Sequence, residues 1–111
     1  MDLSNSTIFA GLCRSQGFPV PVFEHLFAKE IGRKWRFDVA FIDQKIAVEW
    51  EGITWYGNKQ SRHQSAKGFE GDCTKYREAA LLGWVVLRYT QRQQDRAIDD
   101  LKRAFKLRAG R

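Results

Sequence analysis

The chain has 111 residues, enough for one domain with a single modest core and too few for two. Its formal net charge of +6 and its pI near 9.6 favour a polyanionic partner, of which nucleic acid is the commonest. No apolar run approaches the roughly 18 residues that span a bilayer, and the N-terminus lacks the layout of a signal peptide. We therefore expect an intracellular protein with no membrane partner.

The first third of the chain predicts two helices. Residues 4–16 carry apolar side chains at helical spacing, and Gly17 follows as a stop. Pro21 suits the first turn of a second helix, which would end at Gly32. Glu24 would lie in its first turn, where a favourable interaction with the helix dipole is sufficient to explain it.

A β-hairpin is predicted over residues 35–52, WRFDVAFIDQKIAVEWEG, because apolar residues alternate on both sides of a tight turn. If residues 43–44 are the loop, counting back places Asp38 directly opposite Glu49, on a shared face. The other face is aromatic and aliphatic. The polar face gathers Arg36, Asp38, Glu49 and Glu51.

The opposed acids of this hairpin suggest a metal site. Like charges facing each other destabilise a sheet, so Asp38 opposite Glu49 needs a compensating charge. A divalent cation would supply it, and carboxylate oxygens suit Mg²⁺ or Mn²⁺, which also contact substrate phosphates. The alternative is a solvated strand face on which Arg36 pairs with Glu51.

Two basic segments flank the hairpin and could contact phosphates. The first is a cluster just before Asp38, and the second is the aperiodic stretch 53–68, which combines cations with aromatic residues suited to stacking. Solvated loops explain both equally well, and a lone loop histidine is more often neither catalytic nor a phosphate ligand. The candidate nucleic-acid contacts are Arg33, Lys34, Arg36, Lys59, Arg62, His63 and Lys67.

The second half of the chain predicts a helix, a strand and a last helix. Residues 69–82 place Phe69, Cys73, Tyr76 and Ala80 on one apolar helical face, with Asp72, Lys75 and Ala79 on an adjacent stripe. Residues 84–89, WVVLRY, suit an inner strand parallel to the preceding one through a right-handed crossover. Thr90 can cap a strongly basic last helix.

The two cysteines, Cys13 and Cys73, are expected to be free buried thiols rather than a disulfide or zinc ligands.

The order of acidic residues and elements over about residues 19–90 resembles the PD-(D/E)XK nuclease superfamily. In that superfamily an Asp on one strand, and an acidic residue two positions before a Lys on the next, coordinate Mg²⁺, and a Glu on the first helix often joins them. The string WRFDVAF…KIAVEWEG…SRH…KGFEGDCTKYREAALLGWVVLRYT also looks like small phage-associated endonucleases related to Holliday junction resolvases and very-short-patch-repair-like endonucleases.

The resemblance implies that Asp38, Glu49 and Glu24 bind the metal. Glu51 departs from the pattern, because it stands where the superfamily has a lysine, and an acid cannot stabilise the developing phosphate charge as an ammonium can. Lys75 on the following helix is our candidate substitute, with Arg36 as the other. A purely structural role for Lys75, as an intrahelical ion pair with Asp72, is the alternative. Alternatively, Glu51 is a third catalytic carboxylate that helps to hold a second metal.

Together these observations predict a small α/β domain with a restriction-endonuclease-like core. A mixed sheet, built from the hairpin and a crossover strand, would be flanked by helices, with an N-terminal helix in 1–18, a core in 19–90 and a basic helix in 91–111. A fourth strand is not evident, and a second copy of the chain could complete the sheet edge. The expected function is Mg²⁺- or Mn²⁺-dependent cleavage of duplex or branched DNA, and the resemblance to phage-associated endonucleases implies a phage-infected bacterial host. A nicking or single-strand nuclease, a non-catalytic nucleic-acid-binding module and a protein-interaction domain are the alternatives.

Overall fold

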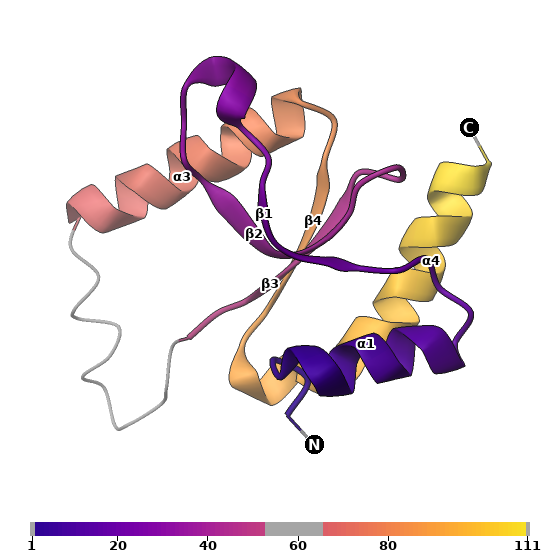
Figure 1. The fold of residues 1–111 in the computed structure, drawn as a ribbon. Coiled ribbons are helices and arrows are strands. Elements are labelled where there is room, and N and C mark those ends of the chain that lie inside the picture. The colour runs from indigo at the N-terminus through magenta and orange to yellow at the C-terminus, as the bar shows by residue number, and fades with distance from the viewer. Residues whose placement is uncertain (1, 53–65, 111) are drawn as a thin grey trace.

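The computed structural model describes residues 2–52 and 66–110 (Figure 1). Its helices are α1 (Ser6–Ser15), α3 (Ala66–Leu81) and α4 (Ala97–Ala109), with short 3-10 helices η1 (Lys29–Ile31) and η2 (Gln91–Arg96). Its strands are β1 (Val22–Leu26), β2 (Arg36–Phe41), β3 (Ile46–Trp50) and β4 (Val85–Tyr89). The predicted mixed α/β class is confirmed.

The four strands form one sheet in the order β1-β2-β3-β4. The pairs β1–β2 and β2–β3 are antiparallel, whereas β4 runs parallel to β3 and is reached through α3, as the sequence predicted. In the hairpin, Phe41 faces Ile46 and Val39 faces Val48, which is the register obtained by counting back from the turn. Lys45 closes that turn with a positive φ of 54°.

Helices cover both faces of the sheet, so the molecule has three layers (Figure 1). Helices α1 and α4 lie on one face over the larger core, which includes Phe9, Phe41, Ile46, Val48 and Leu101. Helix α3 lies on the other face over a smaller core of Phe27, Phe37, Ala40, Ala47, Ala79 and Trp84. The small side chains of Ala40 and Ala47 allow α3 to approach the strands closely, which places α3 residues beside the acidic end of the hairpin.

The predicted helix between Pro21 and Gly32 is wrong. Residues 22–26 are instead strand β1, which supplies the fourth strand that the sequence pattern did not reveal, and only the 3-10 turn η1 is helical. The spacing of Phe23, Leu26 and Phe27 fits a helix, but this stretch pairs along β2, with Phe23 opposite Val39. Pairing with a neighbouring strand therefore overrides the local periodicity.

Helix α3 packs through a different face from the predicted one. Phe69 is 60% exposed and Cys73 is exposed, whereas Ala79, from the adjacent stripe, is fully buried. The helix also begins at Ala66, so residues 66–68 are not part of a loop.

Of the two free thiols, Cys13 is buried as expected and Cys73 is not. Within the described ranges, no helix is long and apolar enough to cross a membrane.

Candidate active site

Asp38 and Glu49 lie side by side where the β2–β3 ladder ends. The main-chain N–H of Asp38 donates to Glu49 Oε2 at 2.8 Å, and the N–H of Trp50 donates to Asp38 Oδ2 at 2.7 Å. Each carboxylate thus accepts a hydrogen bond from the backbone of the opposite strand. Glu49 is buried, with 5% exposure, and Asp38 is half-buried. The backbone itself therefore fixes the position of both acids.

The environment of Asp38 favours its neutral form. Burial, followed by the negative charges of Glu49 and Glu24, raises its pKa to about 6, although the Trp50 N–H acts in the opposite direction. The usual pKa of an Asp side chain is about two pH units lower. Two acids in mutual repulsion at a half-buried position form a site that a cation would stabilise.

Glu24 approaches the same centre from β1 rather than from a helix. It lines a hollow of about 420 Å³ together with Asp38, Phe23 and Trp50 and two serines that precede or begin α1, Ser4 and Ser6. Its φ of 54° is unusual for a residue other than glycine and marks local backbone strain, which is commonest at functional sites. Glu24 Oε2 lies 3.8 Å from Arg36 Nη1, and both side chains are mostly exposed.

Lys75 reaches the acidic centre from α3. Its Nζ lies 2.6 Å from Glu49 Oε1, and the side chain is only 17% exposed. The hydroxyl of Tyr76 donates to the same oxygen at 2.8 Å. Glu49 is consequently bound on one oxygen by α3 and on the other by β2. The predicted alternative for Lys75, an intrahelical pair with Asp72, is not the contact found.

Glu51 pairs with Arg88 and not with Arg36. Arg88 Nη2 lies 2.5 Å from Glu51 Oε1, and its guanidinium also stacks 4.0 Å from the centre of the Tyr76 ring. Continuing the hairpin register beyond its last observed pair, Val39 with Val48, would bring Arg36 opposite Glu51, but the contact found for Arg36 is with Glu24. The Arg36–Glu51 pair, which was the alternative to a metal site, is therefore not found, because β4 brings Arg88 to Glu51.

Tyr76 and Arg88 are site residues that the sequence did not single out for this role. Arg88 had a signal, since it is the one charged residue within the apolar run of residues 84–89. A charge in a buried strand normally has a partner. Tyr76 was assigned to the apolar face of its helix, although its hydroxyl bonds a carboxylate. Burial and the charge of Glu49 raise the pKa of this hydroxyl far above its usual value, so it remains a donor.

The donor set fits Mg²⁺ or Mn²⁺ if two carboxylates suffice. Among residues 2–52 and 66–110, no group of three or more His, Cys, Asp or Glu side chains is arranged to hold a metal. Mg²⁺, however, commonly takes one or two protein carboxylates and completes its shell with waters and substrate phosphates. Asp38 and Glu49 would supply that pair, and Glu24 borders the same hollow.

The candidate nucleic-acid contacts are placed only in part. Arg33, Lys34 and Arg36 are exposed around the start of β2, and the Arg33 guanidinium stacks 4.8 Å from the Trp35 ring centre. Lys67 is exposed on the first turn of α3. Lys59, Arg62 and His63 lie outside the described residues.

Comparison with known proteins leaves the site to be interpreted from its own geometry. No protein-family model matches the sequence, and neither the curated proteins nor the solved structures contain a significant match.

Proposed function

We propose that the protein is a Mg²⁺- or Mn²⁺-dependent DNA endonuclease. The observation that carries this proposal is the fixed pair of carboxylates, Asp38 and Glu49, with the ammonium of Lys75 2.6 Å from Glu49. Two metal-binding acids and one cation are the groups that phosphodiester hydrolysis needs in one place. The basic pI of 9.6 supports a polyanionic substrate.

In this mechanism each residue has a separate task. Asp38 and Glu49 would hold the divalent ion, which, when bound, makes water a stronger nucleophile and polarises the phosphate. Lys75 would place positive charge beside the scissile phosphate as negative charge develops there. Tyr76 orients Glu49, and Arg88 neutralises Glu51, so that an acid at the usual lysine position adds little net charge.

A non-catalytic nucleic-acid-binding module is the second candidate, and one contact favours it. The Lys75 ammonium already occupies Glu49 Oε1, so it competes with a metal for that carboxylate. A protein whose Lys75 never leaves this position would bind DNA through its basic surface without cutting it. Cleavage distinguishes the two candidates.

The direct test is cleavage of end-labelled four-way junction, flap, single-stranded and linear duplex DNA in Mg²⁺ or Mn²⁺. EDTA and an Asp38→Ala variant serve as controls. Metal-dependent nicking that both controls remove supports the nuclease, and the preferred substrate gives its class. Binding without cleavage by a folded protein supports the non-catalytic module. Light scattering on the same samples would show whether a dimer, which paired nicking of a junction requires, is present.

DNA binding should weaken steeply with salt. If the four described cations of the candidate interface each contact one phosphate, log K should fall with log salt with a slope of about −3.6, or roughly 100-fold between about 50 and 200 mM. Lys34→Gln should reduce the steepness of that slope by about 0.9. Fluorescence anisotropy in EDTA measures both. Binding that stays constant over this range would rule out the proposed electrostatic interface. The four cations are Arg33, Lys34, Arg36 and Lys67.

A further inference from the structure

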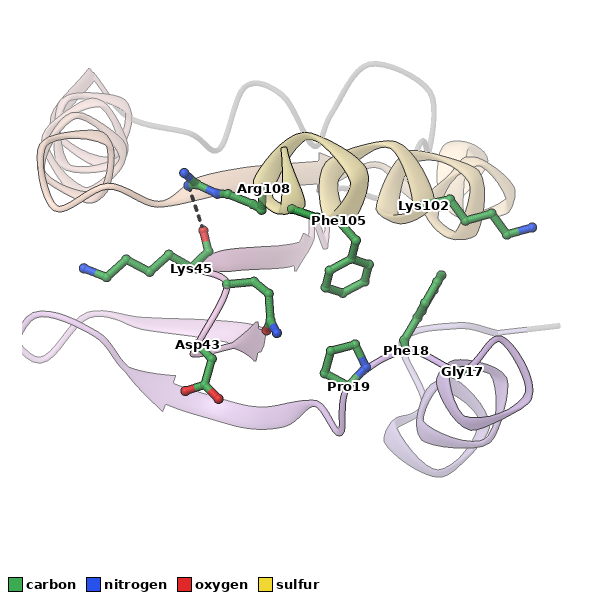
Figure 2. Close-up of a pocket in the computed structure, with 10 residues that line it drawn as sticks. Gly17, Phe18, Pro19, Asp43, Lys45, Lys102, Phe105 and Arg108 are labelled. Atoms are coloured by element: carbon green, nitrogen blue, oxygen red, sulfur yellow. Dashed lines mark hydrogen bonds between the residues drawn. The ribbon is translucent and has the colours of Figure 1, made fainter. Parts of the chain in front are cut away.

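A groove of about 770 Å³ lies at the turn end of the hairpin (Figure 2). The hairpin turn, the C-terminal half of α4 and the segment between α1 and β1 form its walls. Its size is typical of ligand-binding clefts in proteins. The side chains that matter here are Phe18, Pro19, Lys45, Lys102, Phe105 and Arg108.

The middle of the groove is aromatic. The rings of Phe18 and Phe105 have centroids 5.0 Å apart, and Phe105 also packs edge-on against Phe41 of the core at 5.0 Å. Both Phe18 and Phe105 are half-buried, and Pro19 beside them is exposed. In Figure 2 the Phe105 ring points toward Pro19 and Phe18 across the groove. This apolar centre is anchored to the core but keeps an open surface.

The ends of the groove are cationic. Lys45 and Lys102 extend in opposite directions from the aromatic centre, and Arg108 lies near Lys45 (Figure 2). The contacts found for Lys45 and Arg108 are to main-chain carbonyls: Lys45 Nζ lies 2.9 Å from Leu82 O, and Arg108 Nη2 lies 2.5 Å from Gly83 O. Carbonyls orient these cations without neutralising them. The groove lining contains three cations and one acid, Asp43.

Arg108 also has unused donor capacity. Its Nε–H is buried and has no hydrogen-bond partner within the described part of the chain. Buried polar groups are nearly always satisfied, so an exception calls for an explanation. An acceptor that draws the guanidinium toward the groove would provide one.

We propose that this groove binds a single-stranded segment of DNA. A base would lie against Phe18 and Phe105, and phosphates on either side of it would meet Lys102 at one end and Lys45 with Arg108 at the other. Cations spaced along a groove with an aromatic surface between them are the pattern by which proteins bind single strands without reading sequence. A lone phosphate would not explain the aromatic centre, and an apolar peptide would not explain the cations.

The proposal deepens the proposed function and rests on it for the choice of DNA as partner. Asp38 lies five residues before the turn residue Asp43, which corresponds to roughly 17 Å of extended strand. The groove therefore lies well away from the acidic pair and would hold DNA beyond the cleavage point. The substrate class that follows is DNA with an unpaired strand next to the cut, such as a flap or a frayed junction.

The test compares two charge reversals on α4 by fluorescence anisotropy in EDTA, with a short labelled single strand and a duplex of equal length. Lys102→Glu changes a groove residue, and Lys106→Glu is its matched control on the same helix outside the groove. Both positions are exposed, so both variants should fold, which circular dichroism verifies. We expect Lys102→Glu to weaken single-strand binding about tenfold and duplex binding less than about twofold. Lys106→Glu should affect the two DNAs equally and weakly.

Equal losses of single-strand binding in the two variants, or an equal loss on both DNAs for Lys102→Glu, would overturn the proposal. A second readout is the amide NMR spectrum with added thymidine trinucleotide, which should shift signals from residues 17–19 and 43–45. No shift there would also overturn it. All measurements are made without cleavage. If the groove binds single strands but the protein cuts no DNA, this inference stands and the proposed nuclease is wrong. If the protein cuts DNA but the groove does not bind single strands, only this inference is wrong.

Discussion

The Asp38→Asn variant is expected to lose metal-dependent DNA cleavage by at least about 10³-fold and yet to be more stable than the wild type in EDTA. Activity is lost because an amide is a poor ligand for Mg²⁺. Stability rises because the substitution removes a charge that burial, Glu49 and Glu24 all disfavour. The Asn oxygen can still accept from the Trp50 N–H, and its amide can donate to Glu49. Discounted for solvent exposure, the gain should be about 1 kcal/mol at pH 7.

The raised pKa of Asp38 determines how the stability gain of Asp38→Asn depends on pH. The folded-state pKa of Asp38, about 6, lies above the usual value for an Asp, so folding favours the protonated acid. The free energy of unfolding of the wild type should therefore fall as pH rises from about 4 to 6. The advantage of Asp38→Asn should be full above pH 6 and vanish below about pH 4.

Urea unfolding between pH 4 and 7.5 in EDTA measures this difference. Asp43→Asn, at the exposed turn of the same hairpin, is the matched control for replacing one carboxylate by an amide. Added Mg²⁺ should stabilise the wild type and leave Asp38→Asn unchanged, because the ion binds only when both carboxylates are available. A less stable Asp38→Asn protein at pH 7 would contradict the account of a repulsive acidic pair.

Lys75→Met should both destabilise the fold and impair cleavage. The substitution leaves the buried Glu49 charge with Tyr76 and a backbone N–H as its remaining partners, at a cost of about 2–4 kcal/mol. Cleavage should fall by at least about 100-fold, because the cation beside the scissile phosphate is gone. Mg²⁺ should nevertheless bind at least as tightly as in the wild type, since its competitor for Glu49 is removed.

Thermal unfolding, single-turnover cleavage and a Mg²⁺ titration separate these effects. Arg77→Met, exposed on the same helix and outside the candidate DNA interface, controls for the loss of one positive charge and should change stability by less than about 0.5 kcal/mol. Lys75→Arg should recover much of the stability. If Lys75→Met cut DNA at the wild-type rate once folded, Lys75 would be a structural partner of Glu49 only.

The hairpin and its acidic pair were predictable because their determinants are local. Strict alternation decides which side chains share a face, and the tight turn then fixes the register, so Asp38 could be placed opposite Glu49 by counting. Lys75 was found by a weaker argument, namely that a crossover helix packs across the strands it connects. The structure places it there because Ala40 and Ala47 let α3 come close.

The parts that were missed depend on non-local pairing. The spacing of apolar residues around 22–26 fits a helix, and only pairing with β2 makes this stretch a strand. The partner of Glu51 could not be read from the hairpin, because Arg88 arrives on β4 from the other side. Likewise, the fully buried residue of α3 is Ala79, from the adjacent stripe, whereas Phe69 and Cys73 of the more apolar stripe are exposed.

The position of Lys75 in the sequence has a consequence for how the chain folds. The acids meet when the hairpin closes a short loop, a contact between residues 11 apart, whereas the ammonium that meets Glu49 comes from 26 residues further along the chain. Short closures cost less entropy and form faster than long ones. We therefore expect the two carboxylates to face each other during folding before their countercharge arrives, so that the repulsion within the hairpin favours docking of α3.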